Sequence, residues 1–388
     1  MIQGAKSKVQ SAKAETRNPK PGQGVQVMMN AECGLRNAES IHRLRRLRRL
    51  PICEICVICG RTPGLRIAIL LLLLACSVVT ATRYAGDFEE LGVSARAVGM
   101  GSAFVAAGAD PSAMYYNPAA SALSEQRSVL LMHSENFGGL VKNDFASLIL
   151  PAQNSAYGLG LLHNGVFGIK LTELRRPDLP LGAEYTDTTV NGAETTFAAR
   201  INTPVVSRTV NAGDWLLYLN YARAITRGVL VGGNAKVIYR TTGASSCFGM
   251  GLDLGATVVL ARDFNVGLRV RNLTTSPLFW DTRTRESMDP RPVLGLAKGF
   301  TLARDHHVLV SIEAEGNFEG LPIEENLGAE YRFRNLLCGR LGFHRGNFTF
   351  GLGGEYRGFF LDYAYESAPY RDAGDPLASQ RIAGGLRF

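Results

Sequence analysis

The chain contains little cysteine and little tryptophan, and outside its N-terminal region the positive and negative charges nearly balance. Seven of its 388 residues are cysteine, and only Cys247 and Cys338 follow residue 81, which excludes a disulfide framework there. Residues 1–81 carry 13 Lys/Arg against 4 Asp/Glu, whereas residues 82–388 carry 29 against 30. The basic excess therefore belongs to the leader, and the composition argues against a nucleic-acid partner for the rest of the chain.

Long hydrophobic runs are also scarce, and the clearest lies between Arg66 and Arg83. It is short for a spanning helix, which needs about 20 apolar residues. Basic residues before it and small residues after it predict a signal peptide at 64–81, cleaved after Ala81. A single membrane anchor is the alternative. Cys76 ends a stretch that resembles a lipobox, so lipidation of Cys76 is a second processing hypothesis.

Residues 1–63 form a basic leader with Cys53, Cys56 and Cys59 in a Cys-x2-Cys-x2-Cys run. A ferredoxin-type cluster needs a fourth cysteine close behind, and none precedes Cys76. We therefore expect no metal site here, and interpret 1–63 as lying before the true start of translation or as disordered.

From residue 128 onward the apolar residues alternate with polar residues or glycine. Phe264, Val266, Leu268 and Val270, for example, interleave with Asn265, Gly267, Arg269 and Arg271. Alternate residues of a strand face opposite sides, so each segment has one apolar and one polar face. Soluble strands average five or six residues, whereas these segments have the length of membrane-spanning strands. The sequence predicts an all-β fold, a closed antiparallel transmembrane β-barrel at 127–388.

The predicted strands are fourteen, and the connections between them alternate between longer and shorter. This alternation is typical of outer-membrane barrels, which have short periplasmic turns and longer outer loops. Aromatic residues near segment ends predict interfacial girdles, and the terminal Phe388 resembles a barrel-assembly signal. The strands are expected at 128–134, 143–150, 155–163, 214–225, 229–241, 247–259, 264–272, 292–301, 307–316, 325–333, 336–344, 347–356, 359–366 and 380–388.

Residues 82–126 do not alternate, and they are rich in small residues. A barrel of this size has a lumen that its own side chains do not fill. Glycines weaken an isolated helix but allow close packing against a wall. We therefore expect 82–126 to form a small helical hatch in the lumen, with Asn117 as a hinge or capping residue.

Two short motifs in this segment carry a family resemblance. The first motif runs from Gly99-Met100-Gly101-Ser102 to Ala106, and the second runs from Asp110-Pro111 to Tyr116-Asn117-Pro118-Ala119. Together they resemble the N-terminal signature of the PorV/PorQ family. That family is related to FadL-type transporters. The resemblance runs from about Tyr84 to Phe388, and includes a mid-barrel loop from Arg271 to Pro290. It implies a fourteen-stranded barrel with an N-terminal hatch, in which the hatch-motif residues are Gly99, Gly101, Asp110, Pro111, Tyr116, Asn117, Pro118 and Ala119.

The polar faces carry charged residues of both signs. They are either a polar pathway or head-group site, or a mutually neutralising network that joins wall to hatch. The balance of signs favours the network. The candidates for it are Arg269, Arg271, Glu313, Glu330, Arg332 and Glu355.

Motifs of enzymes and cofactor sites are missing from the sequence. We find no GxSxG, no HExxH and no plausible Ser-His-Asp set. We therefore expect no enzymatic activity, no cofactor and no metal. The connection at 164–213 is too long for a plain connector, and predicts either a lid or docking surface or a shield over the barrel mouth.

Two functions are compatible with these observations. The first is passage of hydrophobic compounds across the outer membrane, which requires a break in the wall, for which the pairs Gly232-Gly233 and Gly353-Gly354 are candidates. The alternative is a PorV/PorQ-like accessory role in type IX protein secretion. The expected partners are outer-membrane lipid, the barrel-assembly machinery, and either hydrophobic small molecules or secretion-system proteins.

Overall fold

The computed structural model describes residues 85–388 except 109, 192–193, 261–262, 318–321 and 368–377. The predictions for the leader 1–63, the signal peptide 64–81 and Cys76 lie outside the described residues. Among the described residues, no helix is both long and apolar enough to cross a membrane.

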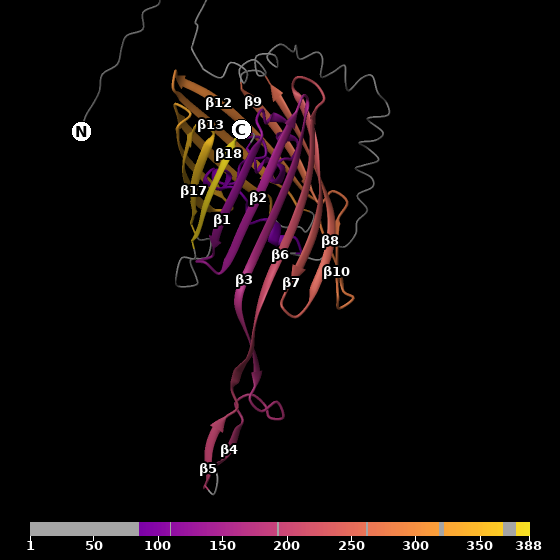
Figure 1. Cartoon of the computed structure of the whole chain (residues 1–388), viewed down its shortest axis with the longest axis vertical. Coiled ribbons are helices and arrows are strands. Elements are labelled where there is room, and N and C mark those ends of the chain that lie inside the picture. Colours follow the sequence, from indigo (N-terminus) through magenta and orange to yellow (C-terminus); the bar gives the residue numbers. More distant parts are fainter. Residues whose placement is uncertain (1–84, 109, 192–193, 261–262, 318–321, 368–377) are drawn as a thin grey trace, which may run out of the picture. The chain divides into compact units, whose positions relative to one another are not determined.

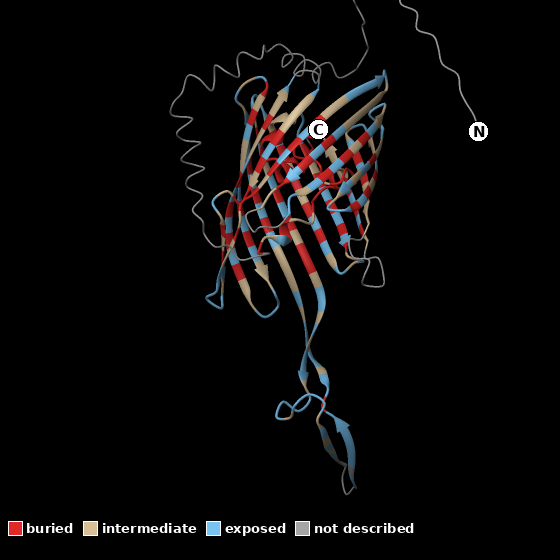
Figure 2. Cartoon of the chain, turned by 180° about the vertical axis from the view of Figure 1, so that it is seen from behind, coloured by how far each residue is buried: buried red, intermediate tan, exposed pale blue. Residues whose placement is uncertain are grey.

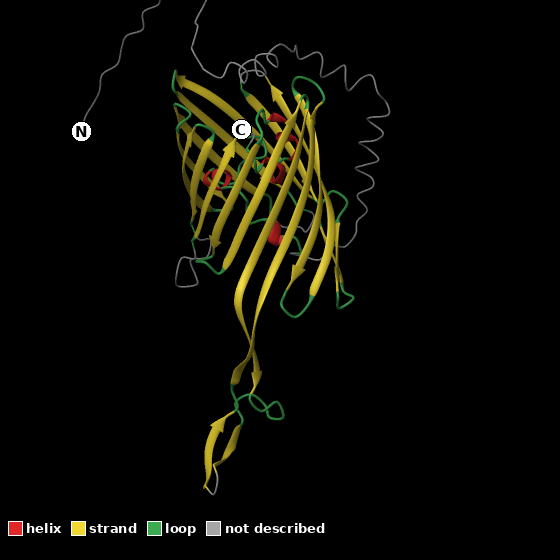
Figure 3. Cartoon of the chain, in the orientation of Figure 1, coloured by secondary structure: helices red, strands yellow, loops and turns green. Residues whose placement is uncertain are grey.

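Fourteen antiparallel strands close into a barrel, which confirms the predicted all-β, closed antiparallel architecture (Figures 1 and 3). Each strand pairs with its neighbour along the ring, and β1 pairs with β18 to complete one side. The pairing of β8 with β9 completes the other side. The barrel strands are β1 (Ser128–Asn136), β2 (Val141–Ala152), β3 (Ser155–Leu174), β6 (Pro204–Ala224), β7 (Val229–Thr241), β8 (Ser246–Leu260), β9 (Phe264–Arg271), β12 (Arg291–Ala303), β13 (His306–Glu315), β14 (Glu324–Phe333), β15 (Leu337–His344), β16 (Asn347–Tyr356), β17 (Phe359–Glu366) and β18 (Ser379–Arg387).

The two longer connections contain strands of their own, which corrects their prediction as loops. Within 164–213, β3 and β6 continue past Gly165 and Gly213 and there pair only with each other. They lead to a separate two-stranded sheet of β4 (Glu184–Asn191) and β5 (Glu194–Ile201) (Figure 1). Within 273–291, β10 (Ser276–Trp280) and β11 (Arg285–Met288) form a hairpin on β8.

Burial alternates along the barrel strands, as Figure 2 shows. In β9, for example, Arg269 and Arg271 are buried and Leu268 is exposed. The outward apolar face includes a row of exposed aromatic residues across neighbouring strands, formed by Trp215, Tyr239, Phe248 and Phe279. Tyr157 and Tyr221 pair near the opposite ends of β3 and β6.

The glycine pairs expected to break the wall do not do so. Gly232 and Gly233 keep continuous register with β6 and β8. Gly353 and Gly354 keep it with β15 and β17. The change of strand partner lies in β8 instead, which pairs with β9 from Leu254 onward and with β10 at 247–249.

Residues 85–108 and 110–126 lie inside the ring of strands and contact the wall through backbone (Figure 1). The segment contains η1 (Asp87–Glu89), α4 (Ala95–Gly99), α5 (Ala113–Tyr116) and η2 (Pro118–Leu123). Gly101 has a φ of 61°, and a Cβ there would lie 2.4 Å from the carbonyl oxygen of Leu327. A side chain on the facing Gly342 would meet the Gly101 amide nitrogen at 2.1 Å.

The same close approach recurs around the barrel. Inward-facing glycines stand where a Cβ would come within 3.0 Å of an atom of the N-terminal segment. They are Gly158, Gly160, Gly232, Gly255, Gly267, Gly295, Gly328 and Gly342.

We predict that Gly342→Ala weakens the docking of residues 85–126, because the new methyl group meets backbone that cannot move aside. Overpacking of this kind costs about 1–3 kcal/mol. The variant should lose its compact gel migration at a lower temperature and become cleavable by protease within 85–126. Gly339→Ala on the same strand is the matched control, because nothing lies within 4 Å of its Cβ. Equal behaviour of the two variants would contradict the prediction.

Candidate functional site in the lumen

Local capping fixes the path of residues 85–126. The hydroxyl oxygen of Ser94 accepts a hydrogen bond from the Ala97 amide at the start of α4. The side chain of Asn117 accepts one from the Ala119 amide at the start of η2, and Pro118 takes the first position of that helix. Ser and Asn are preferred caps and Pro is preferred at the first helical position, so these residues set the turns of the segment.

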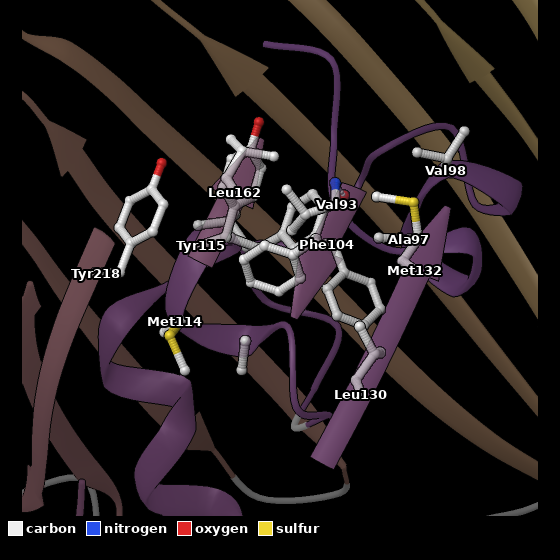
Figure 4. Packing of buried hydrophobic residues seen from close by; sticks show 14 of the residues in the cluster. Val93, Ala97, Val98, Phe104, Met114, Tyr115, Leu130, Met132, Leu162 and Tyr218 are labelled. Atoms are coloured by element: carbon white, nitrogen blue, oxygen red, sulfur yellow. Dashed lines mark hydrogen bonds between the residues drawn. The ribbon is translucent and has the colours of Figure 1, made fainter. Parts of the chain in front are cut away.

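One side of the lumen, along β1, β2, β3 and β6, is mainly apolar, and Ser147, Asn164 and Asn220 of these strands donate to backbone carbonyls of the segment. Figure 4 shows Val93, Val98, Phe104, Met114 and Tyr115 of the segment beside side chains of the wall. The Phe104 and Tyr116 rings meet edge to face at 5.2 Å between centroids. The larger buried apolar residues of this side of the wall are Leu130, Met132, Phe145, Ile149, Leu162, Leu216, Tyr218, Ile238, Leu278 and Phe360. The same cluster continues to Met288 of β11 and Val293 of β12.

The opposite side of the lumen is polar, and its charges hold backbone groups of the segment. Arg269 donates to the carbonyl oxygens of Tyr115 and Tyr116 at 3.3 and 3.2 Å, and lies 3.4 Å from Glu315. One carboxylate oxygen of Glu313 accepts from the Phe104 and Val105 amides at 3.0 and 2.9 Å. These are charge-assisted hydrogen bonds to buried backbone groups.

A second charged cluster joins α4 to the wall. Arg96 donates through Nε and Nη2 to the two carboxylate oxygens of Glu330 at 2.8 and 2.9 Å. Arg340 donates to Glu330 at 2.7 Å and to Asp362 at 2.6 Å. Burial on its own acts to lower the pKa of Arg96, but the Glu330 carboxylate outweighs it and raises that pKa above its ordinary value. The guanidinium therefore stays charged.

A third cluster centres on Lys236 of β7, whose side chain is fully buried. Its Nζ lies 2.7 Å from Glu89 of η1 and 3.1 Å from Asp253 of β8. The backbone carbonyl of Glu89 also accepts from Arg271 at 3.2 Å. Because these groups are out of water, each depends on its partner.

The motif residues of the hatch all meet the wall or cap the segment. Asn117 is fully buried, and its Nδ2 donates to the carbonyl of Val105, to the carbonyl of Ala256 and to the hydroxyl of Thr257. Asp110 caps the Ser112 amide at 2.8 Å. Pro111 and Pro118 accept through their carbonyls from Ser147 and Asn220, and burial raises the pKa of the Tyr116 hydroxyl.

The predicted charged residues do not all reach this interface. Arg269, Arg271, Glu313 and Glu330 contact the segment. Arg332 is partly exposed and binds only Glu330, at 2.9 Å, among the ion pairs described. Glu355 is also partly exposed and pairs with Arg387, near the Arg357-Gly358 turn. Phe388 is exposed, and its amide donates to the Arg127 carbonyl.

Several residues of this site were not predicted from the sequence. Arg340 follows the alternation of its predicted strand, so register could have placed it inward. Asn220 and Asn234, which bind carbonyls of the segment, follow the same rule. Glu89 and Arg96 lie in a segment without periodicity, and no sequence signal identified them.

A small polar cavity of about 30 Å³ remains between the segment and the polar wall. It is lined by Tyr115, Arg269, Glu315 and Asn326, among others. Arg269 Nε, Glu315 Oε1 and Asn326 Oδ1 have no hydrogen-bond partner among the residues that the structure describes. A cavity of this size and polarity suits roughly two ordered water molecules. In the described part of the chain, no group of three or more His, Cys, Asp or Glu side chains is arranged to hold a metal ion.

We predict that Lys236→Met destabilises the barrel by about 3–5 kcal/mol, because it leaves two buried carboxylates without their cation. Arg334→Met is the control, because it removes an exposed partner of Asp305 and should cost at most about 1 kcal/mol. Urea unfolding of the detergent-solubilised protein measures both. A loss for Lys236→Met no larger than that of the control would refute the role of this cluster.

Solved structures similar to this chain include a transporter and a channel. The toluene transporter TodX of Pseudomonas putida shares 13% identity over 76% of this chain and 97% of its own, with a TM-score of 0.48. The monoaromatic hydrocarbon channel CymD shares 12% over 77% and 98%, with a TM-score of 0.46. A Pseudomonas aeruginosa FadL homologue shares 12% over 80% and 98%, with a TM-score of 0.42. No family model and no curated protein sequence matches the chain.

Proposed function

We propose that this protein is an outer-membrane barrel that passes hydrophobic compounds, with residues 85–126 as the hatch that closes its lumen. The observation that carries the proposal is the apolar half of the lumen, where Leu130, Met132 and Leu162 face Phe104 and Met114 of the hatch. A channel for ions or sugars needs a polar lining along its path, whereas an apolar compound is favoured by an apolar lining.

The outer surface supports a membrane location. Large apolar side chains are exposed along the outward face of the strands, among them Leu131, Leu159, Leu268 and Leu352. In water such a surface would cause association, whereas in a bilayer it faces lipid. We assign residues 64–81 to a cleaved signal peptide and the C-terminal Phe388 to recognition by the barrel-assembly machinery.

The apolar lining also reaches the place where the wall changes partners. Ile238 of β7, Cys247 of β8 and Leu278 of β10 belong to the same buried apolar cluster. Here β8 exchanges β9 for β10 as its neighbour. We propose this place, rather than the glycine pairs, as the exit from the lumen into the membrane.

The membrane location predicts heat-modifiable gel migration of the mature chain and its recovery with the outer-membrane fraction. A folded barrel resists unfolding by detergent until heated, because every strand is paired and no edge is free. A mature protein recovered in the soluble fraction would refute this part of the proposal.

Passage requires the hatch to move, and a reversible crosslink tests this directly. A Cβ on Gly295 would lie 3.7 Å from the Cβ of Ala106, which is a disulfide distance. We propose the pair Ala106→Cys and Gly295→Cys, with Val105→Ala to make room and with Cys247 and Cys338 replaced by serine.

The oxidised protein should block uptake of toluene and of a long-chain fatty acid into vesicles, and reduction should restore it. The reduced protein is the control for any effect of the substitutions themselves. Uptake that is the same in both states would contradict a mobile hatch.

The alternative proposal, a PorV/PorQ-like accessory role in secretion, requires the outer rim to bind protein. The extended β3–β6 pair and the β4–β5 hairpin are the elements available for it. Affinity capture from native membranes separates the two proposals. Secretion subunits or cargo would favour the accessory role over passage if they bind the double-cysteine variant equally well in its oxidised and its reduced form.

A further inference from the structure

A polar row crosses the outward face of the barrel, where apolar side chains are the rule. The register places His133 of β1 opposite Asp144 of β2, Asp144 opposite His163 of β3, and His163 opposite Trp215 of β6. Nδ1 of His133 lies 2.6 Å from Oδ1 of Asp144, and Nδ1 of His163 lies 3.8 Å from Oδ2. The His163 and Trp215 rings are 4.0 Å apart. Half of the Asp144 side chain, 51%, is exposed.

The next row on the same face is apolar and hollowed. Leu131, Ala146 and Leu161 stand opposite one another on β1, β2 and β3, and Gly384 pairs with Leu131 from the other side. The small residues between leucines leave a hollow of about 560 Å³ that reaches up to the polar row. An acyl chain fits a groove of this kind, since its floor is a small side chain and its walls are branched ones.

The chemistry of the row favours a cationic hydrogen-bond donor. A carboxylate only accepts hydrogen bonds, so the Nδ1 atom of His133 donates to Asp144. In the neutral ring the Nε2 atom then accepts. The half-exposed Asp144 carboxylate keeps further acceptor sites beside this histidine. An ammonium group therefore meets a carboxylate and an imidazole acceptor side by side.

A phosphate finds less to bind here. The outward cation nearest in register is Lys142, and it stands opposite Glu135 on β1. The row and its hollow are lined by residues that include no serine, threonine or cysteine, so the His133–Asp144 pair has no nucleophile to activate. The geometry is therefore that of a binding site and not of a lipid hydrolase.

We propose that this row and the hollow beside it bind one lipid whose head group carries a primary ammonium, with an acyl chain over Ala146. The site lies on the outside of the wall and goes beyond the proposed passage through the lumen. It rests only on the membrane location of the barrel.

Native mass spectrometry of the detergent-solubilised full chain tests the site. The probes are phosphatidylethanolamine and phosphatidylglycerol with identical acyl chains, added in equal amounts. The wild type should retain one phosphatidylethanolamine in preference. Asp144→Asn should weaken that binding about tenfold, the change produced by losing one charge-assisted hydrogen bond.

Glu325→Gln is the matched control, because Glu325 is an exposed outward residue near the corresponding end of β14. Its binding should equal that of the wild type. Ala146→Phe fills the hollow and should weaken binding of both lipids while heat-modifiable migration stays unchanged. Equal retention of the two lipids, preference for phosphatidylglycerol, or an equal loss in Glu325→Gln would overturn the proposal. The outcome is independent of the crosslinking experiment, which measures passage.

Discussion

Fourteen strands enclose more space than their own inward side chains fill, and this chain fills it with backbone. Gly342 and Gly328 on the wall and Gly101 on the hatch remove the Cβ atoms that would hold the two apart. The backbone N–H and C=O groups that the hatch buries in the lumen must then form hydrogen bonds. The inward Asn and charged residues supply those bonds, for example Asn117 to Val105 and Glu313 to the Phe104 and Val105 amides. The close approach of hatch backbone to wall backbone and the hydrogen bonding of the buried peptide groups are thus two parts of one constraint.

The charges of the lumen follow from the same constraint. A buried charge is tolerated only when it is paired, so wall and hatch carry complementary groups. Lys236 meets Glu89 and Asp253, and Arg96 meets Glu330. The balance of positive and negative charges in the sequence therefore reflects specific ion pairs. A pore selective for anions or cations would instead carry an excess of one sign.

The barrel could be predicted from the sequence because a period of two is imposed on every strand that has an apolar outer face and a polar face toward the lumen. That reason fails where both faces of a strand are exposed. Lys170, Leu171, Thr172 and Glu173 lie in β3 beyond the barrel, show no apolar face, and were expected to form a loop. The lumen contacts could be predicted only in part. Alternation places Arg269 inward, but the partner it meets depends on a hatch whose path is set by caps and glycines rather than by periodicity.

The division of the lumen determines which side of the hatch can yield. On the polar side, separating a pair such as Arg96 and Glu330 leaves a buried charge, which costs about 3–5 kcal/mol. On the apolar side the carbonyls of Pro111 and Pro118 accept from the uncharged side chains of Ser147 and Asn220, and the remaining contacts are non-directional. In the proposed passage, an apolar compound that enters replaces those apolar contacts. Met114 against Gly158 and Gly160 is such a contact, since a flexible thioether lies on bare backbone. The proposed passage therefore begins at lower cost where the hatch meets β3 than where it meets β14, and it is completed only when the hatch also leaves β12, where Val105 and Ala106 pack on Gly295.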